Sequence, residues 1–275
     1  MSVLTTVDEL TAEPDVVLLD VRWALGDPHG HEQYLAGHLP GAVFVDLESE
    51  LAGRASAAEG RHPLPSLQAL QSAARRWGVR NGSRVVVYDA TGGLAAARAW
   101  WLLRWGGMGG AGGTGSVTIL DGGLAAWTGE LETGEVRPVP GDVTLTGGGM
   151  PVLTADQAAA LAGDGVLLDA RAGERYRGEV EPIDPRAGHV PGAVSAPTTE
   201  NLDHDRRFRT AAVLTERFAA LGVAPGVEVG VYCGSGVTAA HEVAALAHAG
   251  IDAALWPGSW SQWSADPARP VGTGP

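Results

Sequence analysis

Short apolar runs recur along the chain and predict buried strands. They stand at Val16–Leu19, Val85–Val87, Val166–Leu168 and Val229–Val231. Continuous runs of this length suit strands that are covered on both faces. Segments with a helical pattern lie between them, at Leu67–Trp77, Leu94–Trp105, Ala211–Leu221 and Thr238–Ala249. This alternation predicts an α/β fold with a parallel sheet and helices on both of its faces.

Helix starts and loops refine this pattern. Thr6 with Glu9, and Thr154 with Gln157, have the spacing of a capping box, which predicts a short helix after each threonine. The glycine-rich run Gly106–Gly115 precedes an apolar strand pattern, so we expect a surface loop there.

The chain repeats itself, because four sequence blocks occur twice in the same order. The pairs are Val16–Trp23 with Gly165–Ala172, Ala36–Val43 with Ala187–Val194, Trp77–Asp89 with Leu221–Cys233, and the stretches that end at Trp127 and Trp263. The period of about 145 residues is the size of a whole domain. We therefore expect two homologous domains, residues 1–140 and 151–275, joined by a glycine-rich linker at residues 141–150.

Charge and composition narrow the function classes. The net charge of −13 argues against nucleic acid and membranes as partners. No apolar stretch approaches the roughly 20 residues of a membrane-spanning helix. The first 20 residues contain five acidic residues and no basic residue, unlike a targeting segment, so we expect a cytoplasmic protein. One cysteine allows no internal disulfide and no thiolate metal cluster, and we expect no metal site and no cofactor.

The single cysteine, Cys233, follows the predicted strand Val229–Tyr232. In an open parallel sheet, ligands bind beyond the carboxyl ends of the strands, which is where Cys233 lies. A lone cysteine is most often a small buried apolar residue. Here the next residues form a short loop with two glycines that ends at a helix start, and we expect their backbone N–H groups to bind an anion; they are Gly234, Ser235, Gly236, Val237 and Thr238. A thiol in such a loop should ionise readily, so the sequence predicts a nucleophile.

The Tyr-Cys-Gly-Ser-Gly-Val-Thr-Ala stretch around Cys233 resembles the active-site loop of the rhodanese superfamily, in particular its 3-mercaptopyruvate sulfurtransferase branch. The blocks Ala187–Val194, Arg175–Gly178 and Glu181–Pro185 and the two tryptophan-ended stretches are also similar to that family. The resemblance implies two rhodanese-like domains, of which the second carries sulfur as a persulfide on Cys233. Asp89 occupies the equivalent position of the first domain. A carboxylate cannot hold sulfur, so the first domain should be inert in transfer.

The resemblance also implies how the sulfur donor is bound. Arg175 matches the family's substrate-binding arginine. Animal members carry a second such arginine where this chain has Ile183, and Arg186, three residues on, is the candidate to replace it. The donor is expected to be a small anion because it needs a guanidinium partner.

Proton-relay residues follow from the same resemblance. Ser235 matches a loop serine with a proposed relay role, although its hydroxyl could equally serve to close the loop. Glu48 aligns with the relay carboxylate. His62 resembles a substrate-site histidine contributed by the first domain, although a lone histidine is more often structural or solvated.

Other functions fit the sequence less well. A phosphatase of this fold needs an arginine six positions after the cysteine, where this chain has Ala239. A cysteine hydrolase needs a histidine base, and His241 lies on the following helix, directed away from the loop. A sulfur carrier or protein-interaction module without turnover stays open as the alternative.

The favoured function is transfer of sulfane sulfur from 3-mercaptopyruvate, or less favourably thiosulfate, to an outside acceptor. Because the chain has no second cysteine, the persulfide cannot be resolved internally, so the acceptor must be a thiol, cyanide or a thioredoxin-like protein.

Overall fold

The computed structural model describes residues 2–13, 15–110, 113 and 115–275. These fold into two compact units. The first comprises Met1–Gly53, Pro65–Met150 and His204–Arg207, and the second comprises Arg54–Leu64, Pro151–Asp203 and Phe208–Pro275. Each unit thus includes a short segment from the other half of the sequence. A division at residues 141–150 does not describe those two segments, and the predicted domain boundaries stay a prediction.

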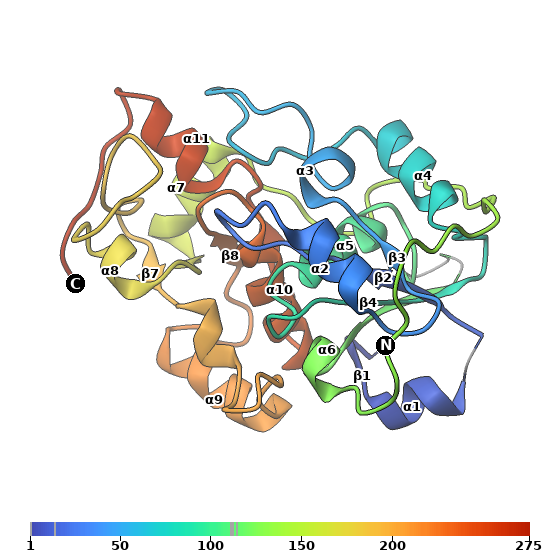
Figure 1. The fold of residues 1–275 in the computed structure, drawn as a ribbon. Coiled ribbons are helices and arrows are strands. Elements are labelled where there is room, and N and C mark those ends of the chain that lie inside the picture. Colours follow the sequence, from blue (N-terminus) through green and yellow to red (C-terminus); the bar gives the residue numbers. More distant parts are fainter. Residues whose placement is uncertain (1, 14, 111–112, 114) are drawn as a thin grey trace. The chain divides into compact units, whose positions relative to one another are not determined.

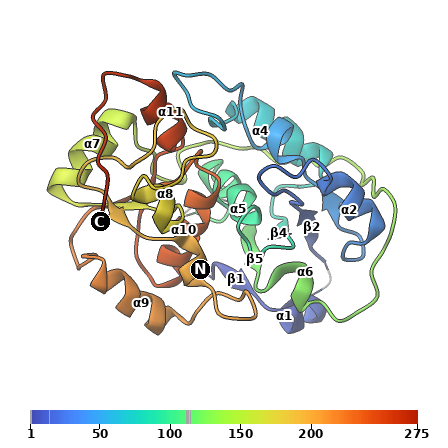
Figure 2. The same cartoon turned by 60° about the vertical axis from the view of Figure 1, so that its left-hand side comes forward.

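The first unit contains a parallel sheet with the strand order β1-β5-β4-β2-β3. Its strands are β1 (Leu4–Thr5), β2 (Val17–Asp20), β3 (Val43–Phe44), β4 (Arg84–Tyr88) and β5 (Ser116–Leu120). Its helices are α1 (Val7–Ala12), α2 (Gly30–Ala36), α3 (Leu47–Glu50), α4 (Leu67–Arg76), α5 (Ala96–Trp105) and α6 (Gly123–Ala126). Helix α5, whose residues are mostly buried, packs against β4 and β5 (Figure 2).

The second unit contains a parallel sheet with the strand order β7-β6-β8-β9, of which β7 and β8 are labelled in Figure 1. Its strands are β6 (Val166–Asp169), β7 (Val194–Ser195), β8 (Val229–Tyr232) and β9 (Ala254–Leu255). Its helices are α7 (Ala155–Asp164), α8 (Gly173–Tyr176), the 3-10 helix η1 (Thr198–Asn201), α9 (Ala211–Ala220), α10 (Thr238–His248) and α11 (Ser259–Ala265). Helix α10 packs against β8 and β9, and α7 against β6 and β8. The predicted α/β class is confirmed in both halves.

The predicted helix starts form as the sequence indicates. Thr6 and Thr154 each accept a hydrogen bond from the backbone N–H three residues on, and the side chains of Glu9 and Gln157 bind back to complete both capping boxes. The predicted loop at Gly106–Gly115 includes Ala111, Gly112 and Thr114, which lie outside the described residues. None of the helices in the described chain is long and apolar enough to cross a membrane.

The sequence repeat appears in the structure as matched tyrosine–histidine pairs. In the first unit, the rings of Tyr34 and His38 stack with centroids 4.1 Å apart, and His38 Nδ1 lies 2.9 Å from the Tyr34 carbonyl. In the second, the rings of Tyr176 and His189 stack at 3.8 Å, with His189 Nδ1 2.8 Å from the Tyr176 carbonyl. Because both units keep this pair, its role is to build the fold.

The core of the second unit lies beneath the predicted active-site loop. Tyr232 at the end of β8 packs in one apolar cluster with Trp256, Trp260 and Trp263. These rings are almost completely buried. These rings pack the end of β8 against α11. Cys233, the residue after Tyr232, therefore follows a well-packed part of the core.

Candidate active site

Cys233 lies at the carboxyl end of β8, with 1% of its surface exposed. Three hydrogen bonds fix its backbone and that of Gly234 to α11. The Cys233 N–H donates to Ser259 Oγ at 3.2 Å, the Trp260 N–H donates to the Cys233 carbonyl at 2.9 Å, and the Ser261 N–H donates to the Gly234 carbonyl at 2.9 Å. The cysteine is therefore held in place from the neighbouring helix as well as from its own strand.

The loop after Cys233 directs a backbone donor at the sulfur. The Gly236 N–H donates to Cys233 Sγ at 3.1 Å. Gly236 has a φ of +79°, and a Cβ at this position would lie 2.6 Å from the Pro257 carbonyl oxygen. Only glycine fits such a turn without strain. An N–H donor aimed at the sulfur favours negative charge on it, as a nucleophile requires.

The corresponding loop of the first unit shows how this turn binds an anion. Asp89 follows β4 as Cys233 follows β8. Its carboxylate accepts four backbone N–H bonds of 2.7 to 3.0 Å, and the donors are Thr91, Gly93, Ala95 and Ala96. The loop and the start of α5 thus enclose a negative charge that the chain itself supplies.

Ser235 and His62 meet beside the cysteine. His62 Nδ1 lies 2.7 Å from Ser235 Oγ, and both residues are buried. His62 belongs to the segment Arg54–Leu64, which is part of the second unit. The segment is fixed there by the Arg61 N–H, which donates to Ser261 Oγ at 3.0 Å, and by Gln262 Nε2, which donates to the Ala58 carbonyl at 2.5 Å.

Arg175 lies on α8 in a network of carboxylates. Its Nη2 donates to Glu181 Oε1 at 2.6 Å and to Asp184 Oδ2 at 3.2 Å. The other oxygen of Asp184 accepts a hydrogen bond from Arg61 Nη1 at 2.6 Å. The sequence did not single out Arg61. Its position next to His62 in an otherwise acidic chain was the only signal that could have drawn attention to it.

Arg171 is held in a buried ion pair at the edge of this group. Its guanidinium binds Asp169 in a fork, with contacts of 2.6 and 3.0 Å, and donates to the Gly188 carbonyl at 2.6 Å. Burial alone would lower the pKa of Arg171, but the Asp169 carboxylate more than reverses this and the pKa is raised. Arg22 makes the same contacts with Asp20 and the Gly37 carbonyl in the first unit. This duplication indicates a structural role.

Two more of the predicted site residues have printed contacts of their own. The guanidinium of Arg186 donates to four backbone carbonyls at 2.5 to 2.9 Å, those of Trp263, Ser264, Asp266 and Arg269. These bonds anchor the C-terminal segment, and the prediction that Arg186 replaces the arginine absent at Ile183 finds no support in the geometry. Glu48 belongs to the first unit, where its Oε1 accepts a bond from Trp23 Nε1 at 2.9 Å. Its relay role stays a prediction.

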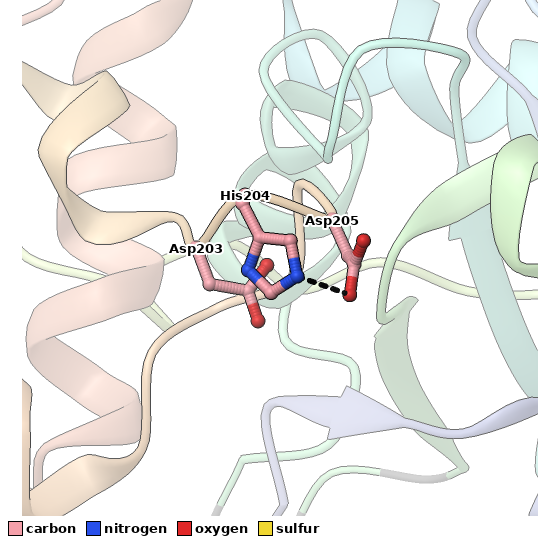
Figure 3. A group of neighbouring side chains, drawn as sticks. All are labelled: Asp203, His204 and Asp205. Atoms are coloured by element: carbon pink, nitrogen blue, oxygen red, sulfur yellow. Dashed lines mark ion pairs between the residues drawn. The ribbon is translucent and has the colours of Figure 1, made fainter.

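Among the described residues, one group of side chains has the spacing of metal ligands. It consists of Asp203, His204 and Asp205, whose ligand atoms lie within 4.8 Å of one another. Figure 3 shows the three consecutive side chains, with Nε2 of His204 directed at Asp205 Oδ2, 3.1 Å away. His204 and Asp205 are exposed. Exposed acidic groups of this kind are common in proteins without a metal, and the group does not include Cys233.

Comparison with known proteins agrees with this geometry. A family model for the rhodanese-like domain matches residues 3–130 and again residues 154–266. A putative thiosulfate sulfurtransferase of Mycobacterium tuberculosis is 51% identical over 99% of this chain and 97% of its own length. A probable 3-mercaptopyruvate sulfurtransferase of Pseudomonas aeruginosa is 47% identical over 98% of both chains.

A solved structure has the same fold over nearly the whole length. The crystal structure of SseA from Escherichia coli, described with the rhodanese fold of 3-mercaptopyruvate sulfotransferases, superposes with a TM-score of 0.81. It is 32% identical, and the match covers 95% of this chain and 100% of that one. The resemblance seen in the sequence is confirmed, and the chain belongs to the rhodanese family, with two rhodanese-like domains in tandem.

Proposed function

We propose that this sulfurtransferase moves sulfane sulfur from 3-mercaptopyruvate to an outside acceptor through a persulfide on Cys233. One observation carries the proposal. The only thiol of the chain lies at the carboxyl end of a buried strand, accepts a hydrogen bond from the Gly236 N–H, and is followed by Gly234, beside which the guanidinium of Arg175 lies. This places a nucleophile and a cation for an anionic substrate beside the same loop.

The first half-reaction transfers sulfur to the enzyme. The Cys233 thiolate attacks the sulfur of 3-mercaptopyruvate, the S–S bond forms, and the carbon–sulfur bond breaks. The electron pair of that bond stays on carbon and gives the enolate of pyruvate, which takes up one proton. The sulfur is oxidised to the sulfane level and the carbon is reduced, so no outside oxidant is needed.

The polar residues of the site have distinct tasks in this step. Arg175 binds the carboxylate of the donor, because a guanidinium matches a carboxylate in charge and shape. The backbone N–H groups of Gly234, Gly236, Val237 and Thr238 are assigned to stabilising the thiolate of Cys233 and the bound anion, and the Gly236 N–H already donates to the sulfur at 3.1 Å. Ser235, paired with His62 at 2.7 Å, delivers the proton to the enolate.

The second half-reaction returns the cysteine to its starting state. An acceptor nucleophile attacks the outer sulfur of the persulfide, and Cys233 leaves as thiolate. A thiol acceptor becomes a persulfide and cyanide becomes thiocyanate. Because Cys233 is the only cysteine, the acceptor is a separate molecule: a small thiol, cyanide or a thioredoxin-like protein. We place this reaction in the cytoplasm, following the sequence-based prediction.

The names of the relatives leave the donor open, since one is a putative thiosulfate sulfurtransferase and another a probable 3-mercaptopyruvate sulfurtransferase. The Cys233 loop supports mercaptopyruvate. Gly234 and Ser235, which follow the cysteine, carry no charge, whereas thiosulfate brings two negative charges that side-chain cations must balance.

Mass spectrometry of the intact protein tests the proposal. After exposure to 3-mercaptopyruvate alone, the protein should gain the mass of one sulfur atom on Cys233. Addition of a thiol should then remove it, and repeated cycles should release sulfide. A protein that gains sulfur but releases no sulfide over repeated cycles would be a sulfur carrier. A protein that gains sulfur from neither 3-mercaptopyruvate nor thiosulfate would contradict the proposal.

A further inference from the structure

A polar pocket of about 350 Å³ lies in the first unit, beside β1 and the amino-terminal part of β5. These two strands are paired and lie side by side in Figure 2. Hydroxyl groups and arginines form much of the lining, namely Ser2, Thr5, Arg84, Arg104, Ser116 and Thr118. None of them belongs to the Cys233 loop or to the Asp89 loop, so sulfur transfer leaves this pocket without a role.

Thr118 brings a buried hydroxyl without a partner to this pocket. The residue is 9% exposed, and its Oγ1 has no hydrogen-bond partner in the described chain. An unpaired buried hydroxyl destabilises a fold, and such groups are rare in native proteins. Ser116, two positions earlier on β5, points to the same side of the sheet and also lines the pocket. A ligand with acceptor oxygens would satisfy Thr118.

Arg104 brings a positive charge that no carboxylate balances. It lies half-buried in the last turn of α5, with its guanidinium carbon 5.3 Å from the centroid of the Trp100 ring. Its buried Nε has no hydrogen-bond partner among the described residues. Burial lowers the pKa of Arg104, and no carboxylate in the described part of the chain raises it again. A charge that is withdrawn from water is normally paired with an opposite charge, so Arg104 also lacks its acceptor.

The two carboxylates that border the pocket are already bound to other groups. Glu13 forms an ion pair with Arg84. Glu9 completes the cap of α1, where it accepts a hydrogen bond from the Thr6 N–H at 2.8 Å. Glu13 therefore balances Arg84, whereas the charge of Arg104 is left for a ligand.

We propose that this pocket binds the oxyanion group, such as a phosphate or a sulfate, of a small molecule. Arg104 supplies the positive charge and N–H donors, and the Thr118 hydroxyl donates a hydrogen bond to one of the oxygens. The volume is that of a small-molecule site, which leaves room for the rest of a small metabolite. This inference goes beyond the proposed function, because sulfur transfer uses no residue of the pocket.

Titration calorimetry with inorganic phosphate and with sulfate tests the site, at an ionic strength held constant with chloride. Arg104→Met removes the charge and keeps an apolar chain over Trp100, so the affinity should fall by about tenfold or more, as for a lost charge-assisted hydrogen bond. Arg175→Met removes anion binding near Cys233 and should keep binding in this pocket. Arg76→Met is the control, because Arg76 is an arginine of the same unit with a side chain that is 59% exposed. Its affinity should stay within about twofold of wild type.

Thr118→Val gives a second measurement and covers the case in which Arg104→Met does not fold. Valine has nearly the shape of threonine but no hydroxyl. Without an anion, Thr118→Val should be at least as stable as wild type, because the unpaired hydroxyl is gone. With phosphate or sulfate present, wild type should gain more stability than the variant, because it binds the anion more tightly. Denaturant titrations with and without the anion measure both effects.

Binding of phosphate, of sulfate or of both, weakened by Arg104→Met, would support the proposal and identify which oxyanion group the site takes. Absence of binding by wild type, or equal affinities of wild type and Arg104→Met, would overturn it. An equal gain in stability from the anion in Thr118→Val and wild type would contradict the role of the hydroxyl.

Discussion

The Nδ1 atom of His62 lies 2.7 Å from the hydroxyl oxygen of Ser235, although 173 positions separate them in the sequence. The contact gives the cysteine loop a hydroxyl whose hydrogen bond is fixed by a buried ring. A hydroxyl needed only to close the loop would bind loop backbone. This pairing instead suits a group that passes a proton.

Ser235→Ala separates these two roles. We expect it to lower kcat with 3-mercaptopyruvate by about 100-fold, the lower end of the contribution of general acid–base catalysis. Sulfite, the leaving group from thiosulfate, needs no proton, so the rate with thiosulfate should change by less than about threefold. Steady-state kinetics with both donors measures this. An equal loss with both would show that the hydroxyl shapes the loop, and His62→Gln should follow the pattern of Ser235→Ala.

Cys233→Ser should abolish sulfur transfer without unfolding the protein. A hydroxyl fits beside the Gly236 N–H, which now donates to the sulfur at 3.1 Å, but it is far too basic to ionise there. The free energy of unfolding should change by about 1 kcal/mol, the usual net value of one hydrogen bond. Sulfide release and denaturant titration are the two measurements. Turnover by this variant would refute the central role of the cysteine.

Asp89 should stabilise the first domain. Because its carboxylate accepts four backbone N–H bonds, Asp89→Ala leaves buried donors without an acceptor. We expect a loss of about 2 kcal/mol or more in unfolding free energy, and a smaller loss for Asp89→Asn, which keeps one acceptor oxygen. Denaturant titration of the two variants checks this order. Equal stability of Asp89→Ala and wild type would mean that water replaces the carboxylate.

Asp89→Cys should not create a second sulfur site. The first domain has no counterpart of the Arg-Tyr-Arg-Gly stretch at Arg175–Gly178, and so it lacks the donor-binding arginine. The change is best made together with Cys233→Ser, so that any sulfur detected by mass lies on the introduced cysteine. Persulfide formation there at a rate comparable to that of Cys233 in wild type would contradict the proposed division between the domains.

The local elements could be predicted from the sequence because their causes are local. The apolar runs appear as β2, β4, β6 and β8 within a residue or two of their expected bounds, and the capping boxes form as predicted. The helix expected from Leu94 begins at Ala96 instead. The Asp89 carboxylate accepts the N–H bonds of Ala95 and Ala96, so loop geometry extends further along the chain than the apolar pattern indicates.

The arginines show what the sequence could not give. Arg186 was a reasonable candidate because it lies close to Ile183, but its four carbonyl partners lie 77 to 83 positions further on. Arg61 binds Asp184 across 123 positions. No periodicity or motif reports such long-range contacts, since they depend on how loops fold back on the sheet. Family resemblance located Cys233, Ser235 and Arg175 because their motifs are contiguous in the chain.

Glu242 should make the stability of the second unit depend on pH. It is completely buried on α10, where it binds Asn201 and Arg217. Burial raises the pKa of Glu242 above its ordinary value of 4.5 and outweighs the attraction of Arg217. The folded state therefore holds this proton more tightly than the unfolded state. The contribution of Glu242 to the free energy of unfolding falls as pH rises from about 4.5 through the raised pKa, and it stays lower at higher pH.

Glu242→Gln should remove that part of the pH dependence. Denaturant titrations between about pH 4 and 8 should show a shallower fall in unfolding free energy for Glu242→Gln than for wild type. Glu200→Gln is the matched control, because Glu200 also contacts Arg217 but has a side chain that is 63% exposed. A pH profile of Glu242→Gln parallel to that of wild type would show that the carboxylate titrates alike in both states.

The choice of donor should follow from the charges around Gly234. Guanidinium nitrogens of Arg61 and Arg175 lie 3.2 and 3.5 Å from a Cβ built on this residue, while Glu181 and Asp184 already balance part of their charge. The single carboxylate of 3-mercaptopyruvate can be matched by this local positive charge. Thiosulfate brings a second negative charge, and neither Gly234 nor Ser235 offers a cation for it, in a protein with a net charge of −13. An unmatched charge in a partly solvated site costs on the order of 1 kcal/mol, and more as water is excluded.

We therefore expect kcat/KM for 3-mercaptopyruvate to exceed that for thiosulfate by at least about tenfold, which corresponds to about 1.4 kcal/mol. Replacing Gly234 by arginine would be a poor test, because a Cβ there lies 3.2 Å from Arg61 Nη2. Ser235→Lys adds a cation two residues after the cysteine and is compared with Ser235→Ala, which lacks the hydroxyl equally, so the added charge should shift the ratio toward thiosulfate beyond the value of Ser235→Ala. Side-by-side kinetics of wild type and both variants at one pH decide the matter. A wild-type preference for thiosulfate would overturn the donor assignment and leave the persulfide on Cys233 in place.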